Sequence, residues 1–390
     1  IIFSQNTGPS GIANSSSLQV WLDASKLTLN DNDPVSQWDD ISGNSNHFTQ
    51  PNLSFQPSFK SSSTINNVPS LRFVSDFLFS SSIPTLEVNN LTWAIVFKTS
   101  NSATQVLLRS NYSSGALNSA GSNTFWGSFS SSSNITLNSS VRNTDNSSQS
   151  NSSNFGTGTN SSVNILNNST SFTSFSNGSS IGNISGSDAS PSSHNFITIG
   201  TDSKSTAFSS FGFIGYIAEV QIYNIALNSA QRIILDNYFS GKYNITLGAD
   251  DKYSYELNYG NEIAGIGRED ASNEHLDATG ESIFRVTATS LDDNDYLIWG
   301  HDNGNLSSTD VGKPISFSSD GKILERKWRV SETNETGDLT FQVDVTNYGF
   351  GTLNTYKLLI DSDGDFTSGA AEIDGVNSSG NLITFTVPSA

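Results

Sequence analysis

Runs of β-forming residues recur along the whole chain, and only one stretch has the periodicity of a helix. In LQVWLD (18–23) the aliphatic side chains fall on alternate positions, which is typical of a strand. LTWAIVFKT (91–99) is a longer, nearly continuous apolar run, as expected of a buried central strand. This pattern predicts an all-β fold of antiparallel sheets, each with one buried and one polar face.

The single predicted helix covers ALNSAQRIILDNYFSGKY (226–243), with Asn228 or Ser229 as its N-cap and Gly241 at its end. Strand patterns continue after it, at SIFRVTATS (282–290), DYLIWG (295–300), ILERKWRVSE (323–332), LTFQVDVT (339–346), TYKLLID (355–361) and NLITFTVP (381–388).

The stretch 128–195 is dominated by Ser, Asn, Thr and Gly, a composition that by itself suits a disordered segment. Apolar residues nevertheless recur there at strand spacing, as in Ile135 and Leu137 or Val163 and Ile165. We therefore expect ordered antiparallel strands with polar outer faces.

Charge divides the chain unevenly. Residues 1–247 contain nine basic and 12 acidic side chains, net −3, whereas residues 248–390 contain nine and 25, net −16. The contrast supports a boundary near residue 247, and a length of 390 residues suits two or three domains. We predict an N-terminal segment (1–13), a first domain (14–247) and a smaller acidic domain (248–390).

Several classes of function are disfavoured by composition. The chain has no Cys, which excludes thiol catalysis and Cys-based metal sites, and its four His residues form no metal-binding pair. A net charge of −19 disfavours nucleic acid as a partner. No run of 18 apolar residues exists, so we predict no membrane insertion.

The two ends allow different readings. Residues 1–4 (IIFS) fit the tail of a signal peptide and an ordinary chain start equally well. The last predicted strand ends two residues before the C-terminus. We therefore expect the native protein to continue into further domains.

LQVWLDAS (18–25), VSQWDDISGNSNHF (35–48) and GFIGYIAEVQIYNIALNSAQ (212–231) resemble the opening and closing segments of laminin-G-like, concanavalin-A-like lectin/glucanase domains of bacterial surface proteins. The resemblance covers about 14–247 and implies a jelly-roll β-sandwich. EIAGIGRED (262–270) and YKLLIDSDGDFTSG (356–369) resemble an uncharacterised β domain that commonly follows such modules in Bacteroidota. It implies a second, smaller β-sandwich in a secreted or cell-surface protein.

Catalysis by the first domain is not expected. Glycoside hydrolysis needs two carboxylates roughly 5–9.5 Å apart over a cleft. Residues 1–247 contain only two Glu, Glu87 and Glu219, and neither lies in an acidic run. We interpret Glu219 as a structural partner at a strand edge, and we predict that the protein is not an enzyme.

Two aromatic residues in polar, loop-like sequence are candidate ligand-binding residues: Trp126 in NTFWGSFS (123–130) and Tyr112 in RSNYSSG (109–115). A flat ring can stack on a sugar, although sandwich cores use such residues too. The loop around Trp38, Asp39 and Asp40 suits a cation or sugar site, but we predict a turn held by Asx hydrogen bonds over a packed Trp38.

The most specific local motif is Asp361, Asp363 and Asp365 with Glu372 at the twelfth position, which predicts a calcium site. Phe366 replaces the Gly of an EF-hand loop and no helices flank it, so a plain acidic turn is the alternative. LDDND (291–295) is a weaker candidate.

These patterns favour a non-catalytic, adhesin-like module that binds carbohydrate or another extracellular polymer. The alternative is a structural spacer or stalk segment of a larger surface protein, without a specific ligand. A third possibility is an accessory module of a hydrolase.

Overall fold

The computed structural model describes residues 7–80, 83, 86–87, 90–101, 105–111, 126–129, 135–142, 148–155, 161–167, 171–185, 193–194, 196–201, 212–281, 283–346, 355–379 and 381–388. The chain divides into two compact units. The inserted unit contains residues 15–227 and 243–250, and the composite unit contains 1–14, 228–242 and 251–390. The composite unit is therefore assembled from three separate stretches of sequence.

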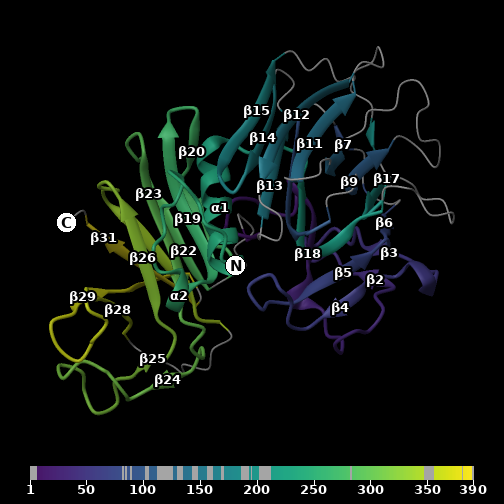
Figure 1. Ribbon diagram of the computed structural model, residues 1–390. Helices are drawn as coiled ribbons and strands as arrows, with labels where there is room; N and C mark the ends of the chain where they lie inside the picture. Colours follow the sequence, from purple (N-terminus) through teal and green to yellow (C-terminus); the bar gives the residue numbers. More distant parts are fainter. Residues whose placement is uncertain are drawn as a thin grey trace. The chain divides into compact units, whose positions relative to one another are not determined.

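Within its described residues, the inserted unit is built on two eight-stranded antiparallel sheets (Figure 1). The first, the β18 sheet, has the order β15-β14-β13-β8-β18-β5-β4, and β1 also pairs with β18. Its strands are β1 (Leu18–Asp23), β4 (Ser58–Lys60), β5 (Ser70–Val74), β8 (Leu91–Lys98), β13 (Ser161–Asn167), β14 (Ser171–Ser176), β15 (Ser179–Ser185) and β18 (Ile214–Tyr223).

The second, the β9 sheet, has the order β12-β11-β10-β9-β17-β6-β3-β2. Its strands are β2 (Gln37–Trp38), β3 (Phe48–Thr49), β6 (Leu78–Ser80), β9 (Val106–Asn111), β10 (Trp126–Phe129), β11 (Ile135–Arg142), β12 (Ser148–Phe155) and β17 (Phe196–Ile199). A small pair, β7 (Leu86–Glu87) and β16 (Ser193–His194), and two 3₁₀ turns, η1 (Ala24–Lys26) and η2 (Leu53–Phe55), complete the unit.

One apolar core joins these two sheets. Trp93 and Val220 come from the β18 sheet, Leu78 and Ile197 from the β9 sheet, and all belong to one buried cluster. Strands β11 to β15 lie within 128–195, so this polar stretch contains antiparallel strands, as its apolar spacing predicted.

The composite unit also packs two antiparallel sheets over a shared core. The β23 sheet has the order β20-β19-β23-β26, and the β27 sheet has the order β21-β22-β27-β31-β30. Trp299 from the first and Phe341 from the second lie in one buried cluster. The all-β, antiparallel fold predicted for both parts of the chain is thereby confirmed. The strands are β19 (Asn261–Asp270), β20 (Asn273–His275), β21 (Asp277–Ala278), β22 (Phe284–Ala288), β23 (Asp295–His301), β26 (Trp328–Thr333), β27 (Leu339–Asp344), β30 (Val376–Ser379) and β31 (Leu382–Val387), with small pairs β24 (Ser308–Thr309) with β25 (Ile323–Leu324) and β28 (Lys357–Ile360) with β29 (Ala371–Asp374).

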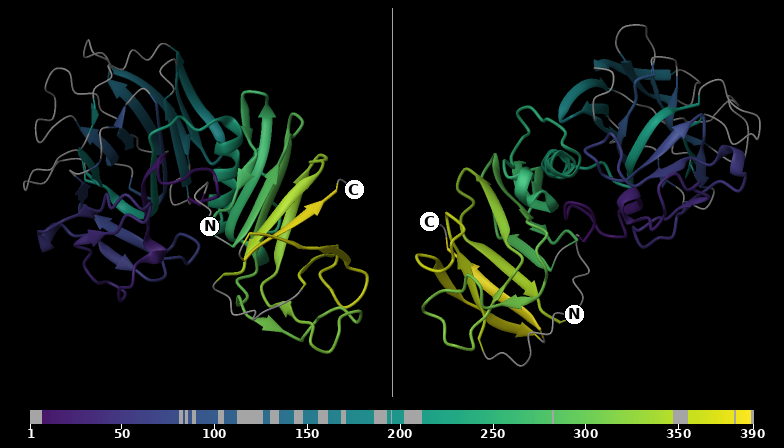
Figure 2. Two further views of the ribbon diagram at one scale, coloured as in Figure 1. Left: turned by 180° about the vertical axis from the view of Figure 1, so that it is seen from behind. Right: turned by 60° about the horizontal axis from the view of Figure 1, so that its bottom comes forward.

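The long helix α1 (Ser229–Tyr243) lies beside the β23 sheet, and a one-turn helix, α2 (Glu256–Tyr259), follows it (Figure 2). Asn228 caps α1 as predicted, since its Oδ1 accepts the Gln231 N–H at 2.9 Å while Gln231 Oε1 accepts the Asn228 N–H at 3.0 Å. The predicted end at Gly241 is wrong. Gly241 lies inside the helix, where a Cβ would come within 2.2 Å of Ile263 Cδ1, so the glycine permits close packing on β19. No described helix is long and apolar enough to cross a membrane.

Residues 8–13, the N-terminal strap, belong to the composite unit. Ser10 forms a parallel bridge with Ala264 of β19, and the Gly11 carbonyl lies 2.9 Å from His275 Nε2. Ile12 is only 1% exposed. The strap thus completes a unit whose other residues begin more than 200 positions later.

Candidate functional site

Glu219 lies at the centre of a buried polar network in the inserted unit. Its Oε1 accepts hydrogen bonds from Trp21 Nε1 at 2.8 Å and Gln221 Nε2 at 2.6 Å, and its Oε2 accepts the Tyr243 hydroxyl. The side chain has no exposed surface. Its structural role agrees with our interpretation, but the position at a strand edge is wrong, because β18 pairs with β1, β5 and β8.

The loop after Trp38 is a turn built round Asp40, as predicted. Asp40 Oδ1 accepts the Trp21 and Ser42 N–H groups, at 2.8 and 3.0 Å, and Oδ2 accepts the Asn46 N–H at 2.8 Å. Trp38 is fully buried. Because these hydrogen bonds occupy both carboxylate oxygens of Asp40, the residue serves the loop's own structure.

Of the two candidate ligand-binding aromatic residues, Trp126 has a backbone position that the structure describes. Tyr112 lies outside the described residues. Trp126 begins β10, where its backbone pairs with Arg109 of β9. Arg109 in turn pairs with Thr198 of β17, and Thr198 with Phe79 of β6. Directly paired residues share one face of a sheet, so Trp126 occupies the same face as Phe79.

That face of the β9 sheet carries an aromatic cluster that the sequence reasoning missed. Ring centroids are 5.6 Å apart for Phe55 and Phe77, 6.5 Å for Phe77 and Phe79, and 5.8 Å for Phe79 and Phe196. None of the four belongs to the main core cluster, whereas Leu78, between Phe77 and Phe79, does. Successive side chains of a strand point to opposite faces, so the apolar run FLF (77–79) was the signal in the sequence for apolar side chains on both faces of this sheet.

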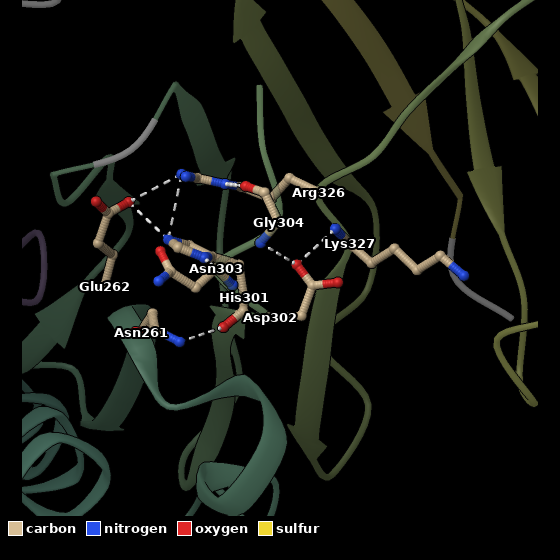
Figure 3. Close-up of polar contacts among 8 residues, drawn as sticks. All are labelled: Asn261, Glu262, His301, Asp302, Asn303, Gly304, Arg326 and Lys327. Carbon is tan, nitrogen blue, oxygen red and sulfur yellow. Dashed lines mark hydrogen bonds and ion pairs between the residues drawn. The ribbon is translucent and has the colours of Figure 1, made fainter. Parts of the chain in front are cut away.

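In the composite unit, His301 is held between Glu262 and Arg326 (Figure 3). His301 Nε2 lies 2.8 Å from Glu262 Oε2, and Nδ1 accepts the Asn303 N–H at 3.0 Å. Because Nδ1 accepts that hydrogen bond, Nε2 is the ring nitrogen that can donate to Glu262. Arg326 Nη1 lies 3.6 Å from the same Glu262 oxygen. Both ring nitrogens have protein partners, so this arrangement fastens the end of β23 and leaves neither nitrogen to activate a nucleophile.

A backbone feature explains how Glu262 reaches the histidine. Glu262 has φ +48°, an uncommon conformation for a residue with a side chain, and the β19–β23 register shifts between Asn261 and Ala264. The irregularity redirects the carboxylate. Sequence alone gave no sign of it, since the strand pattern of 262–270 reads as regular.

Two carboxyl groups near α2 have perturbed acidity. Burial raises the pKa of Glu256, and the charge of Asp251 adds to that rise. Burial also raises the pKa of Asp251. Ser240 Oγ is 3.5 Å from Glu256 Oε1. Glu256 and Asp251 are thus two described carboxyl groups with raised pKa values, one of which acts on the other, as can occur at a catalytic site. Replacing Glu256 therefore tests the prediction that the protein is not an enzyme.

The acidic motif forms a chain of turns. Asp361 Oδ1 accepts the N–H groups of Asp363 and Gly364, both at 2.8 Å, and Asp363 Oδ1 accepts that of Asp365 at 2.8 Å. Two basic side chains from a distant segment also hydrogen-bond to this loop. Lys327 Nζ donates to the Gly364 carbonyl and Arg329 Nη1 to the Ser362 carbonyl, both at 3.2 Å.

Glu372 lies apart from this loop's hydrogen bonds, on β29. Its Oε1 accepts the Ser316 hydroxyl at 2.7 Å and its Oε2 lies 3.2 Å from Lys357 Nζ. These partners lower the pKa of Glu372. Among the described residues, no group of three or more His, Asp or Glu side chains is placed to hold a metal ion. LDDND (291–295) is a turn in which Asp295 Oδ2 accepts the Asp292 N–H.

Comparisons with known proteins give one family match. A family model described as a domain of unknown function (DUF8202) matches residues 231–389. No curated protein sequence matches the chain. Similar solved structures include a SAP-like pentraxin from Limulus polyphemus, with 17% identity over 44% of this chain and 79% of that one, at TM-score 0.34. Domain 4 of the extracellular arabinanase AbnA from Geobacillus stearothermophilus, solved with arabinotriose, has 15% identity over 56% and 97%, at TM-score 0.37. The binding domain of Paraclostridial Mosquitocidal Protein 1 has 10% identity over 96% and 92%, at TM-score 0.41.

Proposed function

We propose that the inserted unit is a non-catalytic module that binds carbohydrate, displayed by a secreted or cell-surface protein, with Trp126 and Tyr112 as ligand-binding residues. The observation that supports this most is the register that brings Trp126 to the same face of the β9 sheet as Phe79. That face points away from the main core, because the intervening Leu78 belongs to the core cluster.

Two described carboxylates of the inserted unit, Glu219 and Asp40, have structural roles, which supports a function without catalysis. Glu219 is buried among neutral donors, and Asp40 is occupied by the loop around it. A retaining or inverting glycosidase needs two carboxyls that face a substrate. The alternative function, a spacer that carries other domains, requires no such ligand.

A glycan-array screen of the full chain tests the proposal. We expect binding to at least one glycan class, weakened about fivefold by Trp126→Ala, because an aromatic stacking contact contributes roughly 1 kcal/mol. Absence of binding to every glycan would favour the spacer. Release of reducing sugar by the full chain would overturn the non-catalytic proposal, unless it disappears in Glu256→Gln, which would place the activity in the composite unit.

A further inference from the structure

We propose that three side chains on the outer face of the β18 sheet, Arg72, Tyr216 and Lys98, bind an acidic polysaccharide made of uronic acids, an inference that rests on the carbohydrate-binding function proposed above. We call these three residues the cationic row. Trp126 belongs to the β9 sheet, so the cationic row gives the inserted unit a second binding face.

Three adjacent strands place the side chains of the cationic row next to one another. Tyr216 of β18 pairs with Arg72 of β5 on one side and with Lys98 of β8 on the other. Directly paired residues share one face of a sheet, with Cβ atoms about 5 Å apart. The tyrosine therefore lies between two cations, whose Cα atoms are two strand spacings, or roughly 10 Å, apart.

The cationic row points away from the core. Leu71, Phe97 and Ile217, each a sequence neighbour of one residue of the row, all belong to the buried cluster between the two sheets. Successive side chains of a strand point to opposite faces, so the row points to the outside of the sandwich. Arg72 is exposed, and the other two residues of the row retain intermediate exposure.

An apolar pair borders the cationic row on the same face. Val74 and Ile214 pair with each other two positions along the same strands, and they are 48% and 39% exposed. The Ile214 backbone is fixed by two side chains, since Gln105 Oε1 accepts its N–H and its carbonyl accepts the Thr99 hydroxyl, both at 2.7 Å. A ring and an apolar pair beside charges suit a sugar, which combines an apolar face with polar groups at its edge.

A third cation lies on this face. Lys60 of β4 is two positions after Ser58, which pairs with Arg72, so both point to the same side of the sheet. The Lys60 ammonium donates to the side-chain oxygen of Asn32, and the Lys98 ammonium donates to the Thr64 carbonyl at 2.8 Å. Both acceptors are neutral, so these contacts hold the ammonium groups and leave their charge in place.

One carboxylate acts on the cationic row. Burial raises the pKa of Asp76, and the positive charge of Arg72 partly opposes that rise. Asp76 Oδ2 also accepts the Val74 N–H at 2.8 Å. Among the described interactions of Arg72, Lys98 and Lys60, this is the one with a negative charge, so three cations and one carboxylate leave the face positive.

The alternation of charge and ring favours a polyuronate over a small anion. A small anion pairs with one cation, whereas a polyuronate carries a carboxylate on every sugar. It can lie across the strands with one sugar on Tyr216 and carboxylates toward Arg72 and Lys98. The planar guanidinium of Arg72 suits a bidentate contact with a carboxylate.

The negative charge of the chain does not prevent such binding. Residues 1–247 contain nine basic and 12 acidic side chains, so they account for only −3 of the total of −19. Exposed charges more than roughly 8 Å apart are largely screened at physiological salt. The local charge of the cationic row therefore decides whether an acidic ligand binds.

The test is isothermal titration calorimetry of the full chain with soluble oligogalacturonate, in buffer with EDTA so that calcium does not cross-link the ligand. Its methyl ester keeps the sugar rings and removes the charges, which makes it the matched ligand control. We expect oligogalacturonate to bind, the methyl ester to bind about tenfold more weakly, and the affinity for oligogalacturonate to fall as salt is raised.

Variants of the cationic row separate charge from stacking. Arg72→Ala and Lys98→Ala should each weaken oligogalacturonate binding about five- to tenfold, the loss of one charge-assisted contact. Tyr216→Ala should weaken it about three- to fivefold, and Tyr216→Phe, which keeps the ring, should bind as the unchanged chain does. Lys322→Ala removes an exposed cation of the composite unit and should change nothing.

Asp76→Asn should strengthen binding. The variant keeps an oxygen for the Val74 N–H and removes the negative charge that acts on Arg72, so the affinity for oligogalacturonate should rise severalfold. A misfolded variant would not produce such a gain, so this measurement keeps the test valid if an alanine variant fails to fold.

The outcomes separate the two proposals. If a neutral glycan binds through Trp126 and oligogalacturonate does not bind, the inference is wrong and the proposed function stands. If oligogalacturonate binds and the variants of the cationic row weaken it, the inference stands whatever Trp126→Ala does. Binding that these variants leave unchanged, or equal binding of dextran sulfate that does not depend on Tyr216, overturns the inference. If no glycan binds, both proposals fail.

Discussion

The two units of this chain bury polar groups in different ways. In the inserted unit, Glu219 is surrounded by neutral donors, two of them on neighbouring positions of one sheet. In the composite unit, His275 is buried against the Gly11 carbonyl, 264 positions earlier, and His301 lies between Glu262 and Arg326. The stability of the inserted unit is therefore expected to depend on the Glu219 carboxylate, whereas that of the composite unit is expected to depend on a histidine that stays neutral when buried and on the N-terminal strap.

The largest effect is expected from removing that carboxylate. Glu219→Ala leaves the donors of Trp21, Gln221 and Tyr243 buried without an acceptor, at a cost of roughly 3–5 kcal/mol. The measurement is urea unfolding of the full chain, followed by fluorescence and circular dichroism. We expect one transition to move to lower urea while the other stays.

Glu219→Gln is the control, because it keeps an acceptor oxygen and should cost less. If Glu219→Ala unfolds at the same urea concentration as the unchanged chain, the network contributes nothing to stability and the comparison between the units fails.

Acid should affect the composite unit more. Burial lowers the pKa of the His275 imidazole from 6.5 to about 4, so folding favours the neutral ring. This stability is complete above pH 6.5 and is lost as pH falls toward 4, with about 2 kcal/mol lost by pH 5. Asp277, the facing carboxylate, opposes the shift only weakly.

Thermal melts between pH 7.5 and 4.5 check this prediction. His275→Gln can still donate to the Gly11 carbonyl but does not titrate, so its composite-unit midpoint should depend less on pH. Identical pH profiles for His275→Gln and the unchanged chain would show that another group is responsible.

Local patterns predicted the strands and the N-cap of α1, because alternation and capping depend on residues that are close in sequence. They misplaced Glu219 and the end of α1, because sheet order and the packing of Gly241 on Ile263 are set by contacts between distant segments. The strap was missed for the same reason: nothing in GPSGIA (8–13) indicates a partner at Ala264 or His275.

The sites follow the same division. The Asp40 turn was predicted because two of its partners, the Ser42 and Asn46 N–H groups, lie within six residues. The contact of Phe55 with Phe77 and that of Glu262 with His301 were missed, because each joins segments that lie far apart in the sequence. In the predicted calcium motif, the three Asp residues share one loop, as their spacing in the sequence indicates. Glu372 instead accepts a hydrogen bond from Ser316, a contact with a distant segment that the sequence does not reveal.

The smallest effect, and the sharpest contrast between the units, is expected from calcium. We propose that Asp361, Asp363, Asp365 and Glu372 bind a calcium ion, which requires Glu372 to exchange Ser316 and Lys357 for the ion. That exchange and the nearby Lys327 predict weak binding, with Kd of roughly 10⁻⁴–10⁻³ M. At several millimolar calcium the gain is on the order of 1 kcal/mol, or about 2–5 °C in melting midpoint.

Thermal melts of the full chain with EDTA and with calcium make the test. Calcium should raise the composite-unit transition and leave the inserted-unit transition where EDTA places it. Asp363→Ala should abolish the rise, because it removes a proposed ligand, whereas Asp39→Ala, which removes an exposed carboxylate of the inserted unit, should retain it. If both transitions ignore calcium, the motif is an acidic turn held by its own amides and by Lys327 and Arg329. If the inserted unit responds instead, the ion binds elsewhere and the proposed ligand set is wrong.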